Sequence, residues 1–311
     1  MNHSSRPEKD NLLFLLALAS AVIVGFFLRV YLLKDQIFAD DEWHGLYYVI
    51  GKSPFWLLTH FSIPGATCVP LNLYTWILGA TIGWSELGLR LPSLICGILC
   101  VLVCPLLARE IIGTRQSAWL ALLLAISPLL IFYSRICRPY SAVALFAFAA
   151  ILFAARWARF GGWRTGVLYI VAAILAVYFH LFAIITALAP ALAAIIYHLL
   201  FRISGKKDQV TVRPPLHHWI LAAAIILTVS ALLLLVPMIQ SMRSTFFTIA
   251  LKGSFNIQSL PPISMLLAGA GQPVLIALFW VAFIVGAIEQ CYKNPWFGWT
   301  LVGLFPLHVL A

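Results

Sequence analysis

The sequence predicts an all-α protein that crosses a membrane several times, and three observations support this prediction. Hydrophobic residues make up 63% of the 311 residues and charged residues only 10%, whereas roughly a quarter of a soluble globular protein is charged. Apolar runs recur at nearly helix-spanning length, which favours helices over barrel strands. Basic residues fall in short clusters between these runs, as orientation signals do. The net charge of +10 therefore indicates membrane orientation, and no nucleic-acid partner is expected.

The apolar segments predict about nine spans in a single transmembrane domain, 1–311. The expected spans are 11–33, 90–108, 116–134, 140–158, 165–180, 182–201, 217–238, 272–289 and an incomplete run from 295 onward. The first is long and lacks the small-residue cleavage pattern of a signal peptide, so we expect it to remain as an anchor. Because the chain stops inside an apolar run, we expect the last span to be cut short.

The basic clusters assign a side to each loop. Placing the clusters at 6–9, 109–115, 156–164, 202–213 and 293 in the cytoplasm satisfies the positive-inside rule. This works only if the apolar stretch 70–84 does not cross, and about 15 residues at about 1.5 Å each do fall short of a ~30 Å core. We therefore expect a first outer loop, 34–89, with helices on the outer surface, as in a helical bundle with juxtamembrane helices.

An acidic cluster follows the first span. Asp40, Asp41 and Glu42 are consecutive, although the chain has only ten acidic residues, and aromatic residues surround them. They predict a general base or a set of metal ligands at the membrane boundary. Neighbours in a helix diverge by about 100°, so we expect one of the three to act. The alternative is a solvated acidic loop that caps the next helix.

Arginines on the predicted outer side form a second candidate group. Arg135 and Arg138 lie in the outer segment 134–140, where positive charge opposes the orientation bias. A guanidinium fork matches phosphate geometry, so a lipid phosphate is the expected partner. Arg29, near the outer end of the first span, would snorkel or reach the same phosphate. Snorkelling at the interface is the alternative for the whole group.

The cysteines show no metal-binding spacing. Cys96, Cys100 and Cys104 recur every four residues, which predicts one helical face of small packing residues. Cys68 and Cys137 would both face the outside, and the sequence does not decide whether they form a disulfide. No metal site is assigned, although a divalent metal remains compatible with the acidic cluster.

Four motifs resemble those of the protein O-mannosyltransferases and their bacterial aminoarabinose transferase-like relatives. The segment 27–31 with Arg29, followed by Asp41-Glu42-Trp43-His44-Gly45, resembles their Arg and Asp-Glu-x-His-Phe-Gly pattern. Arg138-Pro139-Tyr140, the segment 85–93 and Tyr178-Phe179-His180 are similar to further elements, in the same order over residues 12–200. Two segments depart from the pattern: Cys68-Val69-Pro70-Leu71 replaces His-Pro-Pro-Leu, and the Asp that often follows the conserved Arg is absent.

The resemblance implies a GT-C glycosyltransferase that takes a sugar from a polyprenyl-phosphate carrier. It implies Asp41 as the catalytic base of an inverting displacement and Glu42 as its companion. The donor would lie near Arg29, Arg138, Tyr140 and His180, and Asp40, His44 and Arg135 are further candidates. The expected partners are the lipid-linked donor, membrane lipids and an acceptor hydroxyl on a protein, lipid or glycan, at the outer face of a bacterial inner membrane.

Two other classes remain open on the sequence. A transporter would also carry polar residues in its membrane segments, but it should place them near the midplane on broken helices. A non-catalytic scaffold would use the acidic loop to bind a partner protein. Replacing Asp41 by Asn separates these classes, because only an enzyme loses turnover while it keeps its fold.

Overall fold

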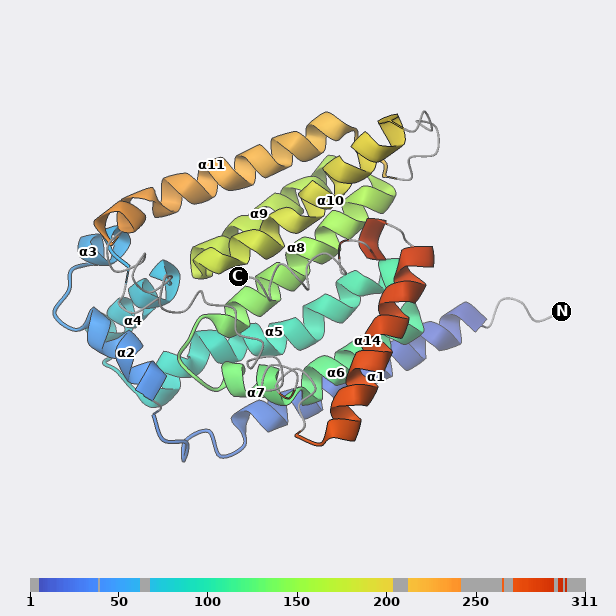
Figure 1. Cartoon of the computed structure of the whole chain (residues 1–311). Helices are drawn as coiled ribbons and strands as arrows, with labels where there is room; N and C mark the ends of the chain where they lie inside the picture. The colour runs from blue at the N-terminus through green and yellow to red at the C-terminus, as the bar shows by residue number, and fades with distance from the viewer. Residues whose placement is uncertain are drawn as a thin grey trace.

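The protein is a helical bundle, seen in a computed structural model that describes residues 6–38, 40–61, 68–203, 212–241, 265, 271–293, 296–298 and 300. Within these ranges every regular element is a helix, as predicted. Long helices run side by side, and three short helices gather at one end of the bundle (Figure 1). The beginning of α1 lies toward the opposite end.

The long helices match the predicted spans closely. They are α1 (Arg6–Val30), α5 (Glu86–Ile112), α8 (Tyr140–Phe160), α9 (Trp163–Phe179), α10 (Ile184–Ile203), α11 (Leu216–Gln240) and α14 (Pro273–Lys293). A 3-10 turn, η1 (Leu181–Ala183), leads into α10. By length and composition, six helices in the described ranges can cross a membrane, and α9 is slightly shorter. The predicted span from 295 onward and most of the loop 239–271 lie outside the described residues.

The predicted span 116–134 is broken in two. It forms α6 (Thr114–Ile126) and α7 (Pro128–Ser134), which meet at an angle of 57°. Pro128 has no backbone N–H to donate to Leu124 O, so the helix cannot continue through it. Ser127 begins the second piece by accepting the N–H of Leu130 at 3.5 Å. After the break, α7 packs against α5, α1 and α8.

Small residues allow the long helices to approach closely. α8 packs against α5 and α9, α1 packs against α6 and α5, and α10 packs against α11. Much of this core is alanine, including Ala149, Ala150, Ala154 and Ala155 on α8, as is usual where membrane helices pack together. On α5, Cys100 and Cys104 are buried and Cys96 is half-buried, in agreement with the predicted packing face.

The short helices α2 (Asp40–Val49), α3 (Pro54–Thr59) and α4 (Val69–Thr81) cover one end of the bundle. Pro54 and Pro70 occupy first turns, where a missing N–H costs nothing. α4 packs against α2, α3, α5 and α9, and α3 also contacts α11. A second apolar cluster anchors them, formed by Phe38, Leu46, Cys68, Leu71, Leu78, Leu89 and Cys137. This arrangement agrees with the prediction that 70–84 does not cross.

The opposite end of the bundle is basic. Arg156 pairs with Glu110 at 3.0 Å, and Arg159 donates to Glu110 O at 2.7 Å. Arg213, shortly before α11, also lies at this end, where its N–H bonds Ala158 O at 2.9 Å. Basic residues of the predicted clusters 109–115, 156–164 and 202–213 therefore come together at this end.

Candidate active site at the short-helix end

A buried ion pair joins α2 to the beginning of α5. Arg90 donates from Nε and Nη2 to the two carboxylate oxygens of Glu42, each at 2.9 Å. Both side chains are fully buried. Glu42 Oε1 also accepts the backbone N–H of Cys137 at 2.7 Å. Two charges can be buried together because the parallel donors of the guanidinium match the carboxylate and the remaining acceptor capacity is used.

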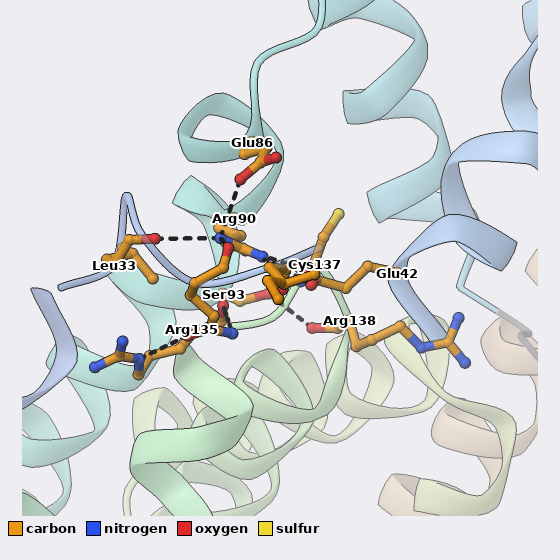
Figure 2. Close-up of polar contacts among 10 residues, drawn as sticks. Leu33, Glu42, Glu86, Arg90, Ser93, Arg135, Cys137 and Arg138 are labelled. Carbon is orange, nitrogen blue, oxygen red and sulfur yellow. Dashed lines mark hydrogen bonds and ion pairs between the residues drawn. The ribbon is translucent and has the colours of Figure 1, made fainter. Parts of the chain in front are cut away.

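Arg90 also binds the loop that connects α1 to α2. Its Nη1 donates to Leu33 O and Gln36 O, and its Nη2 donates to Ile37 O, at 3.2–3.3 Å. Figure 2 shows these contacts converging on Arg90 from different segments. We define the Glu42 clamp as Glu42, Arg90 and the Cys137 N–H. The clamp holds α2, α5 and the segment 135–139 in a fixed relation.

Sequence reasoning missed Arg90, although a signal was present. A charged residue in the first turn of an apolar span is rare unless it has a partner. Glu86, one turn earlier, is half exposed, and its contact with Arg90 is long, at 3.7 Å. The acidic cluster was therefore the better partner to consider, since it was the remaining concentration of negative charge on the same predicted side.

Asp41 forms a second and very different ion pair. Its Oδ2 lies 2.9 Å from Arg138 Nε, with the Asp41 side chain 54% exposed and the Arg138 side chain 10% exposed. The Nε–H bond does not point at the carboxylate, so Nε is buried without a hydrogen-bond acceptor in the described part of the chain. The two groups are thus close but form no aligned hydrogen bond, in contrast to the Glu42 clamp.

The backbone around Arg138 is held more firmly than its guanidinium. Ser93 Oγ donates to Arg138 O at 2.7 Å, and the Arg138 N–H bonds Ile136 O at 2.8 Å. In Figure 2 the Arg138 side chain extends away from the Glu42 clamp, and Arg135 points to the other side. Among the described residues, Nη1 and Nη2 of Arg138 make no hydrogen bond to the protein. They remain available to a ligand.

Tyr140 and His180 lie in the same neighbourhood. The Arg138 guanidinium carbon is 5.8 Å from the centre of the Tyr140 ring. The Tyr140 ring is 6.1 Å from the His180 ring, and Tyr133 packs against Tyr140 at 4.6 Å. The structure therefore brings together Asp41, Arg138, Tyr140 and His180, four of the predicted site residues. His44 lies on α2 with an exposed side chain.

Arg29 has contacts that favour a structural role. It is fully buried and donates to Leu124 O at 3.1 Å and to Ala125 O at 3.0 Å. Its Nε also donates to Ser134 Oγ at 3.1 Å. Leu124 O is the carbonyl that Pro128 leaves without a helical partner, so Arg29 satisfies the break between α6 and α7. That Arg29 reaches a donor phosphate stays a prediction from the sequence, and these contacts do not support it.

Arg135 likewise contacts the protein itself. It donates to Gln36 Oε1 at 2.9 Å, to Tyr31 O at 2.8 Å and to Leu28 O at 3.2 Å. These bonds fasten the end of α1 to the segment after α7. The side chain of Asp40 lies outside the described residues.

The thiols nearby are protonated at neutral pH. Cys68 and Cys137 are free and buried in the same apolar cluster. Burial raises the pKa of each thiol to about 12, and the Glu42 carboxylate contributes to the shift at Cys137. Neither thiol is therefore a thiolate nucleophile. In the described ranges no three His, Cys, Asp or Glu side chains gather as a possible metal site.

Comparison with known proteins identifies the family. The family model described as dolichyl-phosphate-mannose-protein mannosyltransferase matches residues 69–233, more than half of the chain. The match runs from α4 into α11 and includes Arg90, Arg138, Tyr140 and His180, whereas α2 precedes it. No curated protein and no solved structure matches the chain. The chain belongs to the dolichyl-phosphate-mannose-protein mannosyltransferase family, and it is a multi-pass membrane glycosyltransferase of the GT-C type.

Proposed function

We propose that this protein transfers a sugar from a polyprenyl-phosphate donor to a hydroxyl acceptor at the outer face of the membrane, with inversion. The observation that carries this proposal is the ion pair of Asp41 and Arg138, which lacks an aligned hydrogen bond. A half-exposed carboxylate lies 2.9 Å from a guanidinium whose side chain is only 10% exposed. Such a pair offers a proton acceptor and an anion-binding group at one point.

Arg138 is the donor-binding residue in this proposal. Its Nη1 and Nη2 can donate to two oxygens of the donor phosphate, a geometry that a guanidinium favours. As the glycosidic bond breaks, negative charge grows on the departing phosphate. A buried cation stabilises this charge more strongly than an exposed one, because less water screens it. Arg138 would therefore lower the barrier as well as hold the donor.

Asp41 is the general base. Its exposed carboxylate can accept the proton of the acceptor hydroxyl while that oxygen attacks the anomeric carbon from the face opposite the phosphate. One displacement with a single base and a good leaving group inverts the anomeric configuration, and no covalent intermediate is required. Tyr140 and His180 would then form an aromatic wall beside the donor, and the exposed His44, three residues after Asp41 on α2, would meet the acceptor.

Glu42 is a positioning residue in this proposal. Both of its oxygens bind Arg90, and one also accepts the Cys137 N–H. This carboxylate is fully buried, so an acceptor hydroxyl does not reach it. The clamp instead fixes Asp41, its neighbour on α2, relative to Arg138, its neighbour in the segment 135–139. Asp41 is then the residue of the acidic cluster that acts as the general base.

The transfer itself can be tested with purified protein and a panel of polyprenyl-phosphate sugars, beginning with the mannose derivative. We expect release of polyprenyl phosphate with a sugar acceptor or peptide present. Asp41→Asn should lower the turnover by about 10²–10⁴-fold, the range typical of a general base, with little change in donor affinity. If Asp41→Asn turns over at the wild-type rate, the enzyme mechanism is wrong.

The outer-face assignment is tested by membrane-impermeant thiol labelling of intact cells. Tyr47→Cys places an exposed thiol on α2 and should label from outside, whereas Phe160→Cys, at the basic end, should label only after the membrane is opened. Labelling of Phe160→Cys in intact cells would place the active site on the cytoplasmic side.

A further inference from the structure

Gly45 lies beside the guanidinium of Arg138, whose Nη1 and Nη2 make no hydrogen bond to the described protein. It is in the middle of α2, four residues after Asp41, so the two share one helix face. A Cβ built on Gly45 would come to 3.9 Å from Arg138 Nη1 and to 3.9 Å from Cys137 O, with nothing nearer. Glycine thus leaves room for a side-chain carbon beside an N–H of Arg138 that makes no hydrogen bond to the described protein.

Packing does not require glycine at this position. A Cβ on Gly97 would clash with Ser134 Oγ and lie 2.6 Å from Ser134 Cβ, and one on Gly25 would lie 3.3 Å from Ala125 Cβ. Those two glycines allow helices to approach each other. At Gly45 a Cβ would make only ordinary contacts, and α2 has regular helical geometry there. Glycine inside a helix lowers its stability, so the residue has a cost that the fold does not explain.

We propose that Gly45 keeps open the space in which the phosphate of the sugar donor approaches Arg138 Nη1, and that its size determines which donors fit. The inference rests on the function proposed above and deepens it. A phosphate oxygen in this space would accept from Nη1. Cys137 O, on the same rim, can accept a hydrogen bond from a sugar hydroxyl. The space therefore suits a sugar phosphodiester, and the base Asp41 lies one helical turn away.

The experiment compares Gly45→Ala and Gly45→Leu with Gly286→Leu as the matched control. Gly286 is also inside a helix, α14, and a Cβ there has nothing within 4 Å. Binding of polyprenyl phosphate and of the uncharged alcohol polyprenol is measured on the full-length protein in detergent, together with the melting temperature. Gly45→Leu should weaken polyprenyl phosphate binding by at least about 10–200-fold, the range for a misfit of a single methylene in an enzyme pocket. Gly45→Ala should weaken it less.

Three results support the inference together: graded loss of phosphate binding, unchanged polyprenol binding, and melting temperatures no lower than that of the wild type. Gly45→Leu that binds polyprenyl phosphate like the wild type overturns it; if this variant does not fold, Gly45→Ala decides by the same criterion. A wild-type protein that binds no polyprenyl phosphate also overturns it. Graded binding without any sugar transfer would keep this inference and reject the proposed transferase reaction.

Discussion

Two carboxylates that are adjacent in the sequence have opposite surroundings. Glu42 is fully buried and makes two aligned bonds to Arg90 and a third to the Cys137 N–H. Asp41 is half exposed and makes one unaligned contact with Arg138. The step of about 100° between helical neighbours turns one side chain inward and the other toward the surface. The same pairing of acid and arginine is thus buried and fully bonded in one case, and in the other it is the pair on which the proposed reaction depends.

The two pairs should also differ in energy. Removing one partner of a buried pair leaves an uncompensated charge and typically costs 3–5 kcal/mol. An exposed pair contributes about 0–1 kcal/mol, because water screens the charges and the side chains lose freedom. Variants of the Glu42 clamp should therefore be detected in unfolding, and variants of the Asp41 pair in catalysis. This separation is the basis of the predictions that follow.

Glu42→Gln should have the largest effect on the fold. The amide keeps the shape of the side chain but removes the charge that compensates Arg90, so we expect a loss of about 3–5 kcal/mol in unfolding free energy. Thermal unfolding in detergent measures this, and Asp41→Asn is the control, with a change of at most about 1 kcal/mol. Equal melting temperatures for Glu42→Gln and the wild type would show that the clamp does not hold α2.

Arg138→Lys should have the next largest effect, on donor binding. Lysine keeps the charge but loses the forked donors. Since a hydrogen bond to a charged group contributes about 1.5–3 kcal/mol, we expect donor affinity to fall roughly 10- to 150-fold. The fold should be little changed, because the Arg138 guanidinium makes few contacts with the described protein.

Arg135→Lys is the matched control for this change. Arg135 lies three residues earlier, and its guanidinium binds Gln36, Leu28 O and Tyr31 O. Its replacement should lower the melting temperature and leave the affinity of the folded protein for polyprenyl phosphate unchanged. The reverse pattern would assign the phosphate to Arg135: polyprenyl phosphate binding would be weaker in Arg135→Lys and unchanged in Arg138→Lys.

The sequence predicted the order of the spans because each depends mainly on its own composition. Apolar length alone located α1, α5, α8, α10, α11 and α14 within a few residues. The convergence of Asp41, Arg138, Tyr140 and His180 was also predictable, since the positive-inside rule put them all at one end of the bundle. Residues that share a compartment and carry complementary chemistry are natural candidates for one site.

The roles of individual arginines were less predictable, because they depend on the rotation of helices relative to one another. Arg29 was placed at a phosphate by its position near the end of α1. The structure shows it bound to carbonyls at the break before Pro128, and a helix break in α6 and α7 leaves no mark in the sequence of α1. A phosphate contact of Arg29 stays a prediction. The burial of Glu42 was unpredictable for a similar reason, since Arg90 approaches α2 from the side that buries Glu42.

Ser93→Ala should have the smallest measurable effect, and it tests whether the segment 135–139 must be held in place. Ser93 Oγ donates to Arg138 O at 2.7 Å from a buried position. A neutral hydrogen bond contributes about 0.5–1.5 kcal/mol, so we expect donor affinity or turnover of the folded protein to fall by roughly 2- to 12-fold. The charges of Asp41 and Arg138 remain in this variant, so any loss is due to the position of Arg138 and not to a change of charge.

Ser117→Ala provides the comparison for Ser93→Ala. Ser117 is fully buried on α6, and its hydroxyl has no hydrogen-bond partner in the described structure. Removing that hydroxyl should leave catalysis unchanged and the melting temperature equal or higher, since an unsatisfied polar group is lost. If both alanine variants turn over at the wild-type rate, Arg138 is positioned without Ser93, and the Cys137 N–H of the Glu42 clamp and the bonds of Arg135 suffice to hold the segment. If Ser93→Ala alone loses turnover, the hydrogen bond from Ser93 fixes the backbone from which Arg138 reaches the donor.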